Sequence, residues 1–323
     1  MLEIRDLSVK LAAGRAARPI LDGVSLTVEA GETVGLVGES GSGKSVTCRS
    51  VLGLLPNGAQ ATGEVLVGGD NVLKMSKSRL RQLRRQEAAM IFQDPRASIN
   101  PLRRIGDFLT EALRAGGVSQ RVALTKAEEL LEAVGIRDPH GALRKYPHEF
   151  SGGMLQRVMI AGALSGGSRL LLADESTTAL DVTTQAEVIS ILTGLQAERG
   201  MGMLFVTHDL ELAAAICDRI YVMYAGRIVE SQSVDGLFEA PRHPYTAGLL
   251  AATPQLESDA APRGVPGRPL SLAEARTGCA FAARCTHAGE RCTQEDPVLL
   301  RLGQHDSHAI DVACLKAEEL VHG

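Results

Sequence analysis

The sequence predicts an α/β fold built around a largely parallel sheet, and three features of the chain carry this prediction. A strand-like run over 33–37 leads directly into a glycine-rich loop of the pattern G-x-x-x-x-G-K-S. Two further runs, over 170–173 and 203–206, are apolar throughout, as in parallel strands covered on both faces. Both runs end in polar residues, which is where ligands bind in open α/β sheets.

The remaining elements follow from the spacing of apolar residues along the chain. Residues 2–9 and 24–28 alternate between apolar and polar, so we expect strands there, and another strand over 63–69. A helix is expected over 46–55, ending before Pro56. The stretch 101–146 is helical in pattern, and Gly135 is well placed to cap the helix that covers 127–134.

The glycine-rich loop has the composition of a phosphate-binding loop. It consists of Gly38, Glu39, Ser40, Gly41, Ser42, Gly43, Lys44 and Ser45, followed by Val46. The glycines let consecutive N–H groups surround phosphates, and the following helix points its positive end at them. Lys44 would reach the β- and γ-phosphates, and Ser45 would be a ligand of Mg²⁺. A chance turn that happens to contain a lysine is disfavoured by the strand that precedes it.

Two other polar groups suit the same chemistry. Asp174 and Glu175 follow an apolar strand, where Asp174 would hold Mg²⁺ directly or through water and Glu175 would orient or deprotonate an attacking water. Such a pair is otherwise a solvated strand end. Ser151 is a candidate helix N-cap, and Gly152 and Gly153 expose N–H groups, which makes a second anion site. By itself this segment would be interpreted only as a helix cap.

The bulk composition narrows the class of protein. With 323 residues we expect one large domain and a smaller one, and the net charge of −4 gives no electrostatic reason to expect nucleic acid. No apolar run approaches the ~20 residues of a membrane span, and the segment 1–6 does not resemble a secretion signal. We therefore expect a cytosolic chain unless a partner holds it at a membrane. Six cysteines then favour metal, redox or packing roles over disulfides.

In their order, these motifs resemble the ATP-binding cassette of ABC transporters. Phe92-Gln93-Asp94-Pro95 matches the family's Q-loop, Thr178-Ala179-Leu180-Asp181 its D-loop, and Val206-Thr207-His208-Asp209 its H-loop. The resemblance covers residues 1 to about 235. It implies an α/β P-loop NTPase of ABC type that hydrolyses ATP. Such a cassette has an antiparallel β subdomain and a helical subdomain, here at about 95–165.

The resemblance also implies roles for single residues. Gln93 would contact Mg²⁺ and sense a membrane partner, His208 would contact the γ-phosphate, and Asp181 would communicate across a dimer. In the family, ATP lies between the phosphate loop of one subunit and the Ser-Gly-Gly helix of the other. Taken singly, Gln93 would be an ordinary surface glutamine and His208 a satisfied histidine at a strand end.

Three positions depart from the family pattern. No aromatic residue precedes Phe92, so stacking on adenine must use aliphatic or arginine side chains from 11–20, or be weak. We therefore expect little discrimination between ATP and GTP. Ser176 stands where the family mostly has proline, which should loosen that turn, and Leu155 replaces a usual arginine.

Several stretches narrow the resemblance to the ATP-binding subunits of dipeptide/oligopeptide importers, namely 93–95 with 98–101, 223–230 and 243–250. That group also takes up nickel, glutathione and other small solutes. It implies two integral-membrane permease subunits, a second and usually non-identical ATP-binding subunit, and an extracytoplasmic solute-binding protein. The chain would then lie at the cytoplasmic face of the membrane and bind no nucleic acid. A soluble ABC ATPase acting on nucleic acid is the alternative, but such relatives usually have two cassettes or long coiled-coil insertions.

The last part of the chain, 236–323, is expected to be a separate extension that begins with a proline-rich connector. It holds Cys279, Cys285, Cys292 and Cys314, whereas Cys48 and Cys217 are expected to be core residues. Four thiolates suit zinc, although the C-x2-C pairs typical of structural zinc are absent. The extension resembles that of peptide-importer ATPases, some of which carry a 4Fe–4S cluster on this cysteine set. We expect such a cluster, with zinc or no metal as alternatives.

Overall fold

The computed structural model describes all residues except 14–15, 178–179, 254–263, 276, 303–309 and 323. The described chain forms two compact units. The first unit contains Lys74–Leu204 together with Met1 and Glu29–Glu32. The second unit contains Leu2–Val28, Thr33–Leu73 and the chain from Phe205 onward. The mixed α/β class predicted from the sequence is confirmed.

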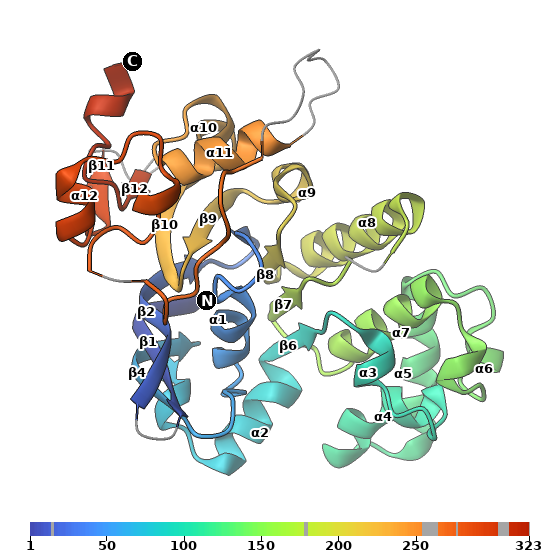
Figure 1. Ribbon diagram of the computed structural model, residues 1–323. Coiled ribbons are helices and arrows are strands. Elements are labelled where there is room, and N and C mark those ends of the chain that lie inside the picture. Colours follow the sequence, from blue (N-terminus) through green and yellow to red (C-terminus); the bar gives the residue numbers. More distant parts are fainter. Residues whose placement is uncertain (14–15, 178–179, 254–263, 276, 303–309, 323) are drawn as a thin grey trace. The chain divides into compact units, whose positions relative to one another are not determined.

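An antiparallel sheet opens the second unit, with strand order β2-β1-β4-β5 (Figure 1). Its strands are β1 (Leu2–Ala13), β2 (Ala16–Val28), β4 (Ala59–Val67) and β5 (Asp70–Asn71). Leu2 and Ile4 of β1 pair with Val28 and Leu26 of β2, and all four side chains are buried. The alternation over 2–9 and 24–28 therefore correctly predicted strands, and these strands are longer than expected.

The second unit also contains the strand that leads into the phosphate loop. This strand, β3 (Thr33–Val37), is buried throughout and pairs in parallel with β9 (Arg219–Tyr224). Beyond β9, the strands β10 (Arg227–Ser233), β12 (Ile310–Val312) and β11 (Leu300–Leu302) continue in antiparallel pairs. A buried, parallel β3 holds the start of the loop on a rigid element.

The helices of the second unit are short. They are α1 (Lys44–Ser50), η1 (Val72–Lys74, whose last residue belongs to the first unit), α9 (Leu210–Ile216), α10 (Val234–Glu239), α11 (Pro244–Ala252), η3 (Ala282–Arg284), α12 (Glu290–Gln294) and η5 (Glu319–His322). The prediction of a helix over 46–55 is wrong at its C-terminal end, because α1 ends at Ser50. The chain then tightens into turns and Gly53 adopts a left-handed φ of 62°, which no regular helix accommodates.

The first unit combines two buried parallel strands with most of the longer helices (Figure 1). Its elements are α2 (Lys77–Gln86), β6 (Ala88–Ile91), α3 (Pro95–Ser98), α4 (Ile105–Ala115), α5 (Gln120–Ala133), α6 (Pro139–Ala142), η2 (Pro147–Glu149), α7 (Gly152–Leu164), β7 (Leu170–Asp174) and α8 (Val182–Arg199). The strand β8 (Gly202–Thr207) runs across the division between the units. The apolar runs at 170–173 and 203–206 are thus strands, as predicted.

The helices of the first unit pack through small and aliphatic side chains. Ala123, Ala127 and Leu131 of α5 are buried, as is Leu109 of α4. The helix α5 ends one residue earlier than its pattern suggested, and Gly135 takes the left-handed conformation (φ 74°) just beyond the C-cap. None of the helices within the described ranges is long and apolar enough to cross a membrane.

Candidate nucleotide site and C-terminal thiols

The phosphate loop depends on glycines at three positions. Gly38, Gly41 and Gly43 have φ values of 152°, 82° and 110°, a region that side chains rarely allow. A Cβ on Gly38 would lie 2.2 Å from the carbonyl oxygen of Met223, and one on Gly43 would lie 2.6 Å from a methyl carbon of Leu21. The loop therefore packs closely against its own unit and leaves its backbone, rather than side chains, to line the site.

The lysine of the loop folds back over it. Lys44 Nζ donates to the carbonyl oxygens of Gly38 at 2.7 Å and Glu39 at 3.1 Å, and the side chain is 4% exposed. Ser42 is also buried, and its hydroxyl has no hydrogen-bond partner among the described residues. A buried hydroxyl without a partner beside glycine N–H groups fits a phosphate ligand, which would supply the missing bond.

The acidic pair lies at the end of β7 in the first unit. Asp174 is 1% exposed, and Glu175 has a left-handed φ of 47°, which is unusual for a residue with a side chain. Gln93 Nε2 donates to Glu175 Oε2 at 2.8 Å. The strands β6 and β7 pair in parallel, so their carboxyl ends lie side by side. Asp174 is the last residue of β7, Glu175 follows it, and Gln93 lies just beyond β6. These three residues, predicted to bind Mg²⁺ or the attacking water, are therefore close together.

The Ser-Gly-Gly segment begins a helix, as predicted. Ser151 is the N-cap of α7, where its hydroxyl accepts from the N–H of Met154 at 3.3 Å. A Cβ on Gly153 would lie 2.4 Å from the Thr184 methyl, so this glycine allows α7 and α8 to approach. Beside this N-terminus lies a cavity of about 500 Å³, lined in part by Ser151 and Gly153. Its charged lining residues are the cations Arg137, Lys145 and Arg157 and the acids Asp138 and Glu187. The volume and the small excess of positive charge suit an anionic ligand.

The D-loop and H-loop residues both border helices. Thr178 and Ala179 lie outside the described residues, whereas Asp181 is the N-cap of α8. The carboxylate of Asp181 accepts from the N–H of Thr184 at 3.0 Å and from its hydroxyl at 2.7 Å, which lowers the pKa of Asp181. His208 is exposed at the end of β8, just before α9, and it belongs to the same unit as the phosphate loop.

Two family models match the chain. The model described as ABC transporter matches residues 21–178, and the one described as oligopeptide/dipeptide transporter, C-terminal region, matches residues 229–292. The "probable peptide ABC transporter ATP-binding protein" of Sinorhizobium fredii is 44% identical over all of this chain and 96% of its own length. The chain belongs to the ABC transporter family.

Other comparisons agree with this assignment of the cassette. The oligopeptide transport ATP-binding protein OppD of Bacillus subtilis is 42% identical over 96% of the cassette chain and 87% of its own length. Among solved structures, an ATP-binding cassette captured as a dimer after hydrolysis, with ADP and Pi bound, is 27% identical. It has a TM-score of 0.65 and aligns with 72% of this chain and 99% of its own. ATP and Mg²⁺ are the ligands typical of such ATPases.

All four cysteines of the C-terminal region belong to the second unit of the cassette subunit. The N–H of Cys279 donates to the carbonyl of Cys292 at 2.8 Å. Burial raises the pKa of Cys279 to about 11, and the three other thiols contribute to this shift. Even so, no three His, Cys, Asp or Glu side chains within the described ranges are arranged to hold a metal ion. The expected 4Fe–4S cluster thus finds no support in this arrangement.

Cys48 and Cys217 are buried among apolar side chains, which confirms their expected place in the core. Burial raises the pKa of the Cys217 thiol, so this cysteine is an unreactive core residue.

Sequence reasoning missed one group of residues beside the phosphate loop. Arg284, Tyr224 and Tyr245 all contact the loop or each other, although they come from the C-terminal half of the chain. Tyr245 lies in the stretch 243–250, which indicates the subfamily but not a contact with the loop. Arg284 directly precedes Cys285, and an arginine within the cysteine pattern is the one sequence feature that points to this group.

Proposed function

We propose that this chain binds MgATP and hydrolyses it as the ATP-binding subunit of an ABC importer for peptides. The observation that carries the proposal is the phosphate loop, which combines three left-handed glycines, a lysine folded over the loop and a buried hydroxyl that finds no hydrogen-bond partner in the described part of the chain. The family assignment and the peptide-transport names of the relatives support it.

Each predicted residue has a place in this proposal. Gly38 to Val46 surround the triphosphate, and Lys44 turns from the loop carbonyls to the β- and γ-phosphates. Ser45, Gln93 and Asp174 would hold Mg²⁺, which neutralises phosphate charge when bound. Glu175 takes the proton of the attacking water, and its bond from Gln93 orients the carboxylate. His208 contacts the γ-phosphate.

The signature half-site serves a second cassette. Ser151, Gly152 and Gly153 present the N-terminus of α7 to an ATP held by the partner's phosphate loop, and Asp181 communicates across that contact. The cavity beside Ser151 supports this role, because the cations Arg137, Lys145 and Arg157 outnumber the acidic residues Asp138 and Glu187 in its lining. Hydrolysis of ATP to ADP and phosphate, followed by release of the phosphate, then takes negative charge out of the contact between the two cassettes, which makes the dimer a switch driven by its ligand.

The partners follow from the same proposal. Two integral-membrane permease subunits would change conformation when the cassette dimer closes. A related but non-identical chain would supply the second cassette. An extracytoplasmic binding protein would deliver the solute. The chain itself would be peripheral, at the cytoplasmic face of the membrane, and bind no nucleic acid. Peptides are favoured over nickel, glutathione or another small solute by the names of the relatives.

The decisive experiment reconstitutes the complete transporter in proteoliposomes. The chain is purified with the integral-membrane proteins that accompany it, and uptake of labelled di- and oligopeptides is measured with MgATP on the side of the cassettes. We expect uptake that is lost in Lys44→Ala, while the complex still assembles. Uptake of nickel or glutathione instead would overturn the peptide assignment, and co-purification with nucleic acid but no membrane protein would overturn the importer assignment.

We further propose that Cys279, Cys285, Cys292 and Cys314 hold a 4Fe–4S cluster, with zinc as the alternative. The support is the number and spacing of these cysteines in the sequence and the resemblance of the extension to that of peptide-importer ATPases, whereas the side chains that the structure describes are not arranged to hold a metal ion. No step of ATP hydrolysis depends on this group. Iron, sulfide and zinc are measured on anaerobically purified protein. A colourless sample free of iron would end the cluster proposal.

A further inference from the structure

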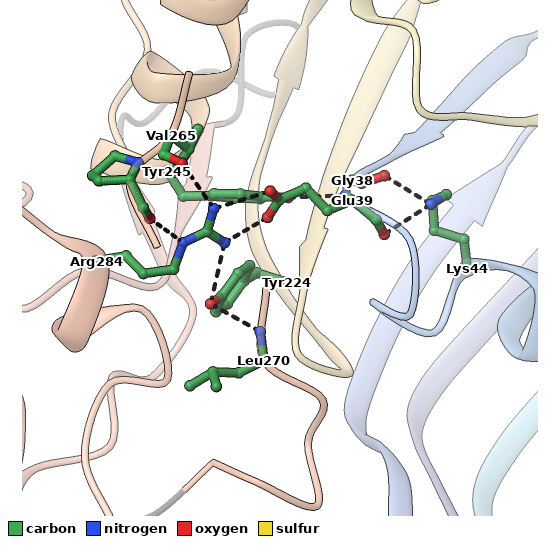
Figure 2. Close-up of polar contacts among 9 residues, drawn as sticks. Gly38, Glu39, Lys44, Tyr224, Tyr245, Val265, Leu270 and Arg284 are labelled. Carbon is green, nitrogen blue, oxygen red and sulfur yellow. Dashed lines mark hydrogen bonds and ion pairs between the residues drawn. The ribbon is translucent and has the colours of Figure 1, made fainter. Parts of the chain in front are cut away.

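The C-terminal region forms an ion pair with the phosphate loop. Glu39 is the second residue of the loop, and both of its carboxylate oxygens are bound by the guanidinium of Arg284 (Figure 2). The two N···O distances are 2.6 and 3.0 Å. The Arg284 side chain is 4% exposed and that of Glu39 is 23% exposed. A two-pronged, largely buried pair of this kind is among the stronger polar contacts in proteins and has a defined geometry.

Arg284 is itself held in place by its surroundings. Its Nε donates to the carbonyl oxygen of Pro266 at 2.7 Å, and a terminal nitrogen donates to that of Val265 at 3.4 Å. The guanidinium carbon lies 5.7 Å from the ring centres of both Tyr224 and Phe281, two rings that contact each other edge to face with their centres 5.4 Å apart. These contacts leave the guanidinium little freedom, so its position defines where the Glu39 carboxylate must lie.

The backbone of Glu39 is fixed as well. Its N–H donates to the hydroxyl of Tyr245 at 2.9 Å, and its carbonyl accepts from Lys44 Nζ at 3.1 Å (Figure 2). Glu39 is therefore held at its side chain, its N–H and its carbonyl. The last of these contacts is made by the lysine that must reach the phosphates, so a continuous chain of polar contacts runs from Arg284 through Glu39 to Lys44.

The negative charge of Glu39 explains why these contacts matter for binding a triphosphate. Glu39 is the one acidic residue in the segment 38–46, and that segment is the part of the chain that must receive a triphosphate. An uncompensated carboxylate there would repel the ligand, whereas a carboxylate neutralised by a guanidinium would not.

We propose that Arg284 is a positioning residue for nucleotide binding, which neutralises Glu39 and fixes the first turn of the phosphate loop. The inference rests on the proposed binding of MgATP by this loop. It assigns the C-terminal region a role in the ATP site of its own chain, independent of whether its thiols hold a metal. Arg284 acts through Glu39 and Lys44 and does not touch the reacting atoms.

The test compares four variants with the wild type in the assembled complex. These are Arg284→Ala, Arg284→Lys, Glu39→Gln and the double variant Arg284→Ala/Glu39→Gln. Binding of MgATP and MgADP is measured with a fluorescent nucleotide and by competition, and KM and kcat are measured for hydrolysis. We expect Arg284→Ala to raise the Kd for MgATP by about tenfold or more, with a smaller effect on MgADP, because the repulsion scales with ligand charge. The change should appear in KM more than in kcat.

The double variant separates charge from packing. Removing the Glu39 charge together with Arg284 should restore most of the MgATP affinity lost in Arg284→Ala, and Arg284→Lys should be intermediate because an ammonium cannot bind both oxygens. If the double variant binds no better than Arg284→Ala, the charge argument is overturned. A wild-type Kd in well-folded Arg284→Ala would overturn it too.

Glu39→Gln keeps the test decisive should Arg284→Ala fail to fold. It retains a hydrogen-bond acceptor for Arg284 and removes the negative charge, so the ratio of the MgATP Kd to the MgADP Kd should fall below the wild-type ratio. A ratio equal to or above that of the wild type would contradict the inference. These outcomes differ from a failure of the proposed function itself, in which the wild-type chain would bind no MgATP at all.

Discussion

The amide nitrogen of Gln93 donates to the carboxylate of Glu175 at a distance of 2.8 Å. Glu175 follows β7, and Gln93 lies two residues beyond β6, the strand that pairs in parallel with β7. A hydrogen bond from a neutral amide orients a carboxylate without neutralising it, so Glu175 keeps the ability to accept a proton. This relationship makes the carboxylate the first place to test the proposed chemistry.

We predict that Glu175→Gln lowers kcat for ATP hydrolysis by at least about a hundredfold, because an amide cannot take a proton from water. Binding of MgATP should remain, so the variant should accumulate as a closed cassette dimer in ATP. Light scattering after gel filtration measures the dimer, and phosphate release measures hydrolysis. Glu198→Gln, an exposed position near the end of α8, is the matched control. Hydrolysis at the wild-type rate in Glu175→Gln would show that another group is the base.

The phosphate loop offers a second test, because two of its glycines differ in the space around them. Gly38 has a φ of 152° and its Cβ would lie 2.2 Å from the Met223 carbonyl oxygen, whereas Gly41 has a φ of 82° and open space around it. Gly41→Ala should cost only the backbone strain of about 1–3 kcal/mol. Gly38→Ala should cost more in unfolding free energy and also abolish MgATP binding, since the loop must shift. Urea denaturation and nucleotide binding measure both. Equal losses in the two variants would contradict this account.

The sequence predicted those parts of the fold that local patterns determine. The strand before the loop, the buried runs at 170–173 and 203–206, and the N-cap at Ser151 each depend on neighbours in the sequence. The early end of α1 was missed because apolar spacing continued past Ser50, while the backbone at Gly53 turned left-handed.

The contact between Arg284 and Glu39 could not be predicted in the same way, since it joins residues 245 positions apart. No periodicity or motif links an arginine next to a cysteine with an acidic residue in a phosphate loop. Only the folded second unit, in which Arg284 and Phe281 of the C-terminal region pack against Tyr224, brings the two charges together. The roles assigned to single site residues stay predictions until variants are measured.

The absence of an aromatic residue before Phe92 leads to a prediction on nucleotide choice. Stacking of a base on an aromatic ring is worth about 1–3 kcal/mol, and nothing of that kind is available from the first 91 residues. We expect the Kd values for MgATP and MgGTP to agree within about tenfold, since phosphate contacts dominate. Competition against one fluorescent nucleotide measures both, with ADP and GDP as the control pair. A strong preference for ATP would refute the prediction.

A buried histidine in the C-terminal region connects stability with pH. His243 is 2% exposed, and its Nδ1 accepts from the N–H of Tyr245 at 3.0 Å, which caps α11. Burial lowers the pKa of His243 to about 4, despite a hydrogen bond with the backbone of Ala313 that opposes the shift. The carboxylate of Glu230 accepts from the backbone N–H of His243 at 2.9 Å, and burial raises the pKa of that carboxyl.

The folded chain therefore keeps His243 neutral in a pH range where the unfolded chain protonates it. Between the unfolded pKa of about 6.5 and the folded value of about 4, the unfolded state binds the extra proton, so His243 reduces stability as pH falls. The slope approaches about 1.4 kcal/mol per pH unit within this window. In His243→Asn the amide oxygen can still cap α11 but does not titrate, and the contribution of Glu230 is common to both proteins. The free energy of unfolding in urea should thus fall more steeply below pH 6.5 for the wild type than for His243→Asn, and parallel curves would exclude His243 as the titrating group.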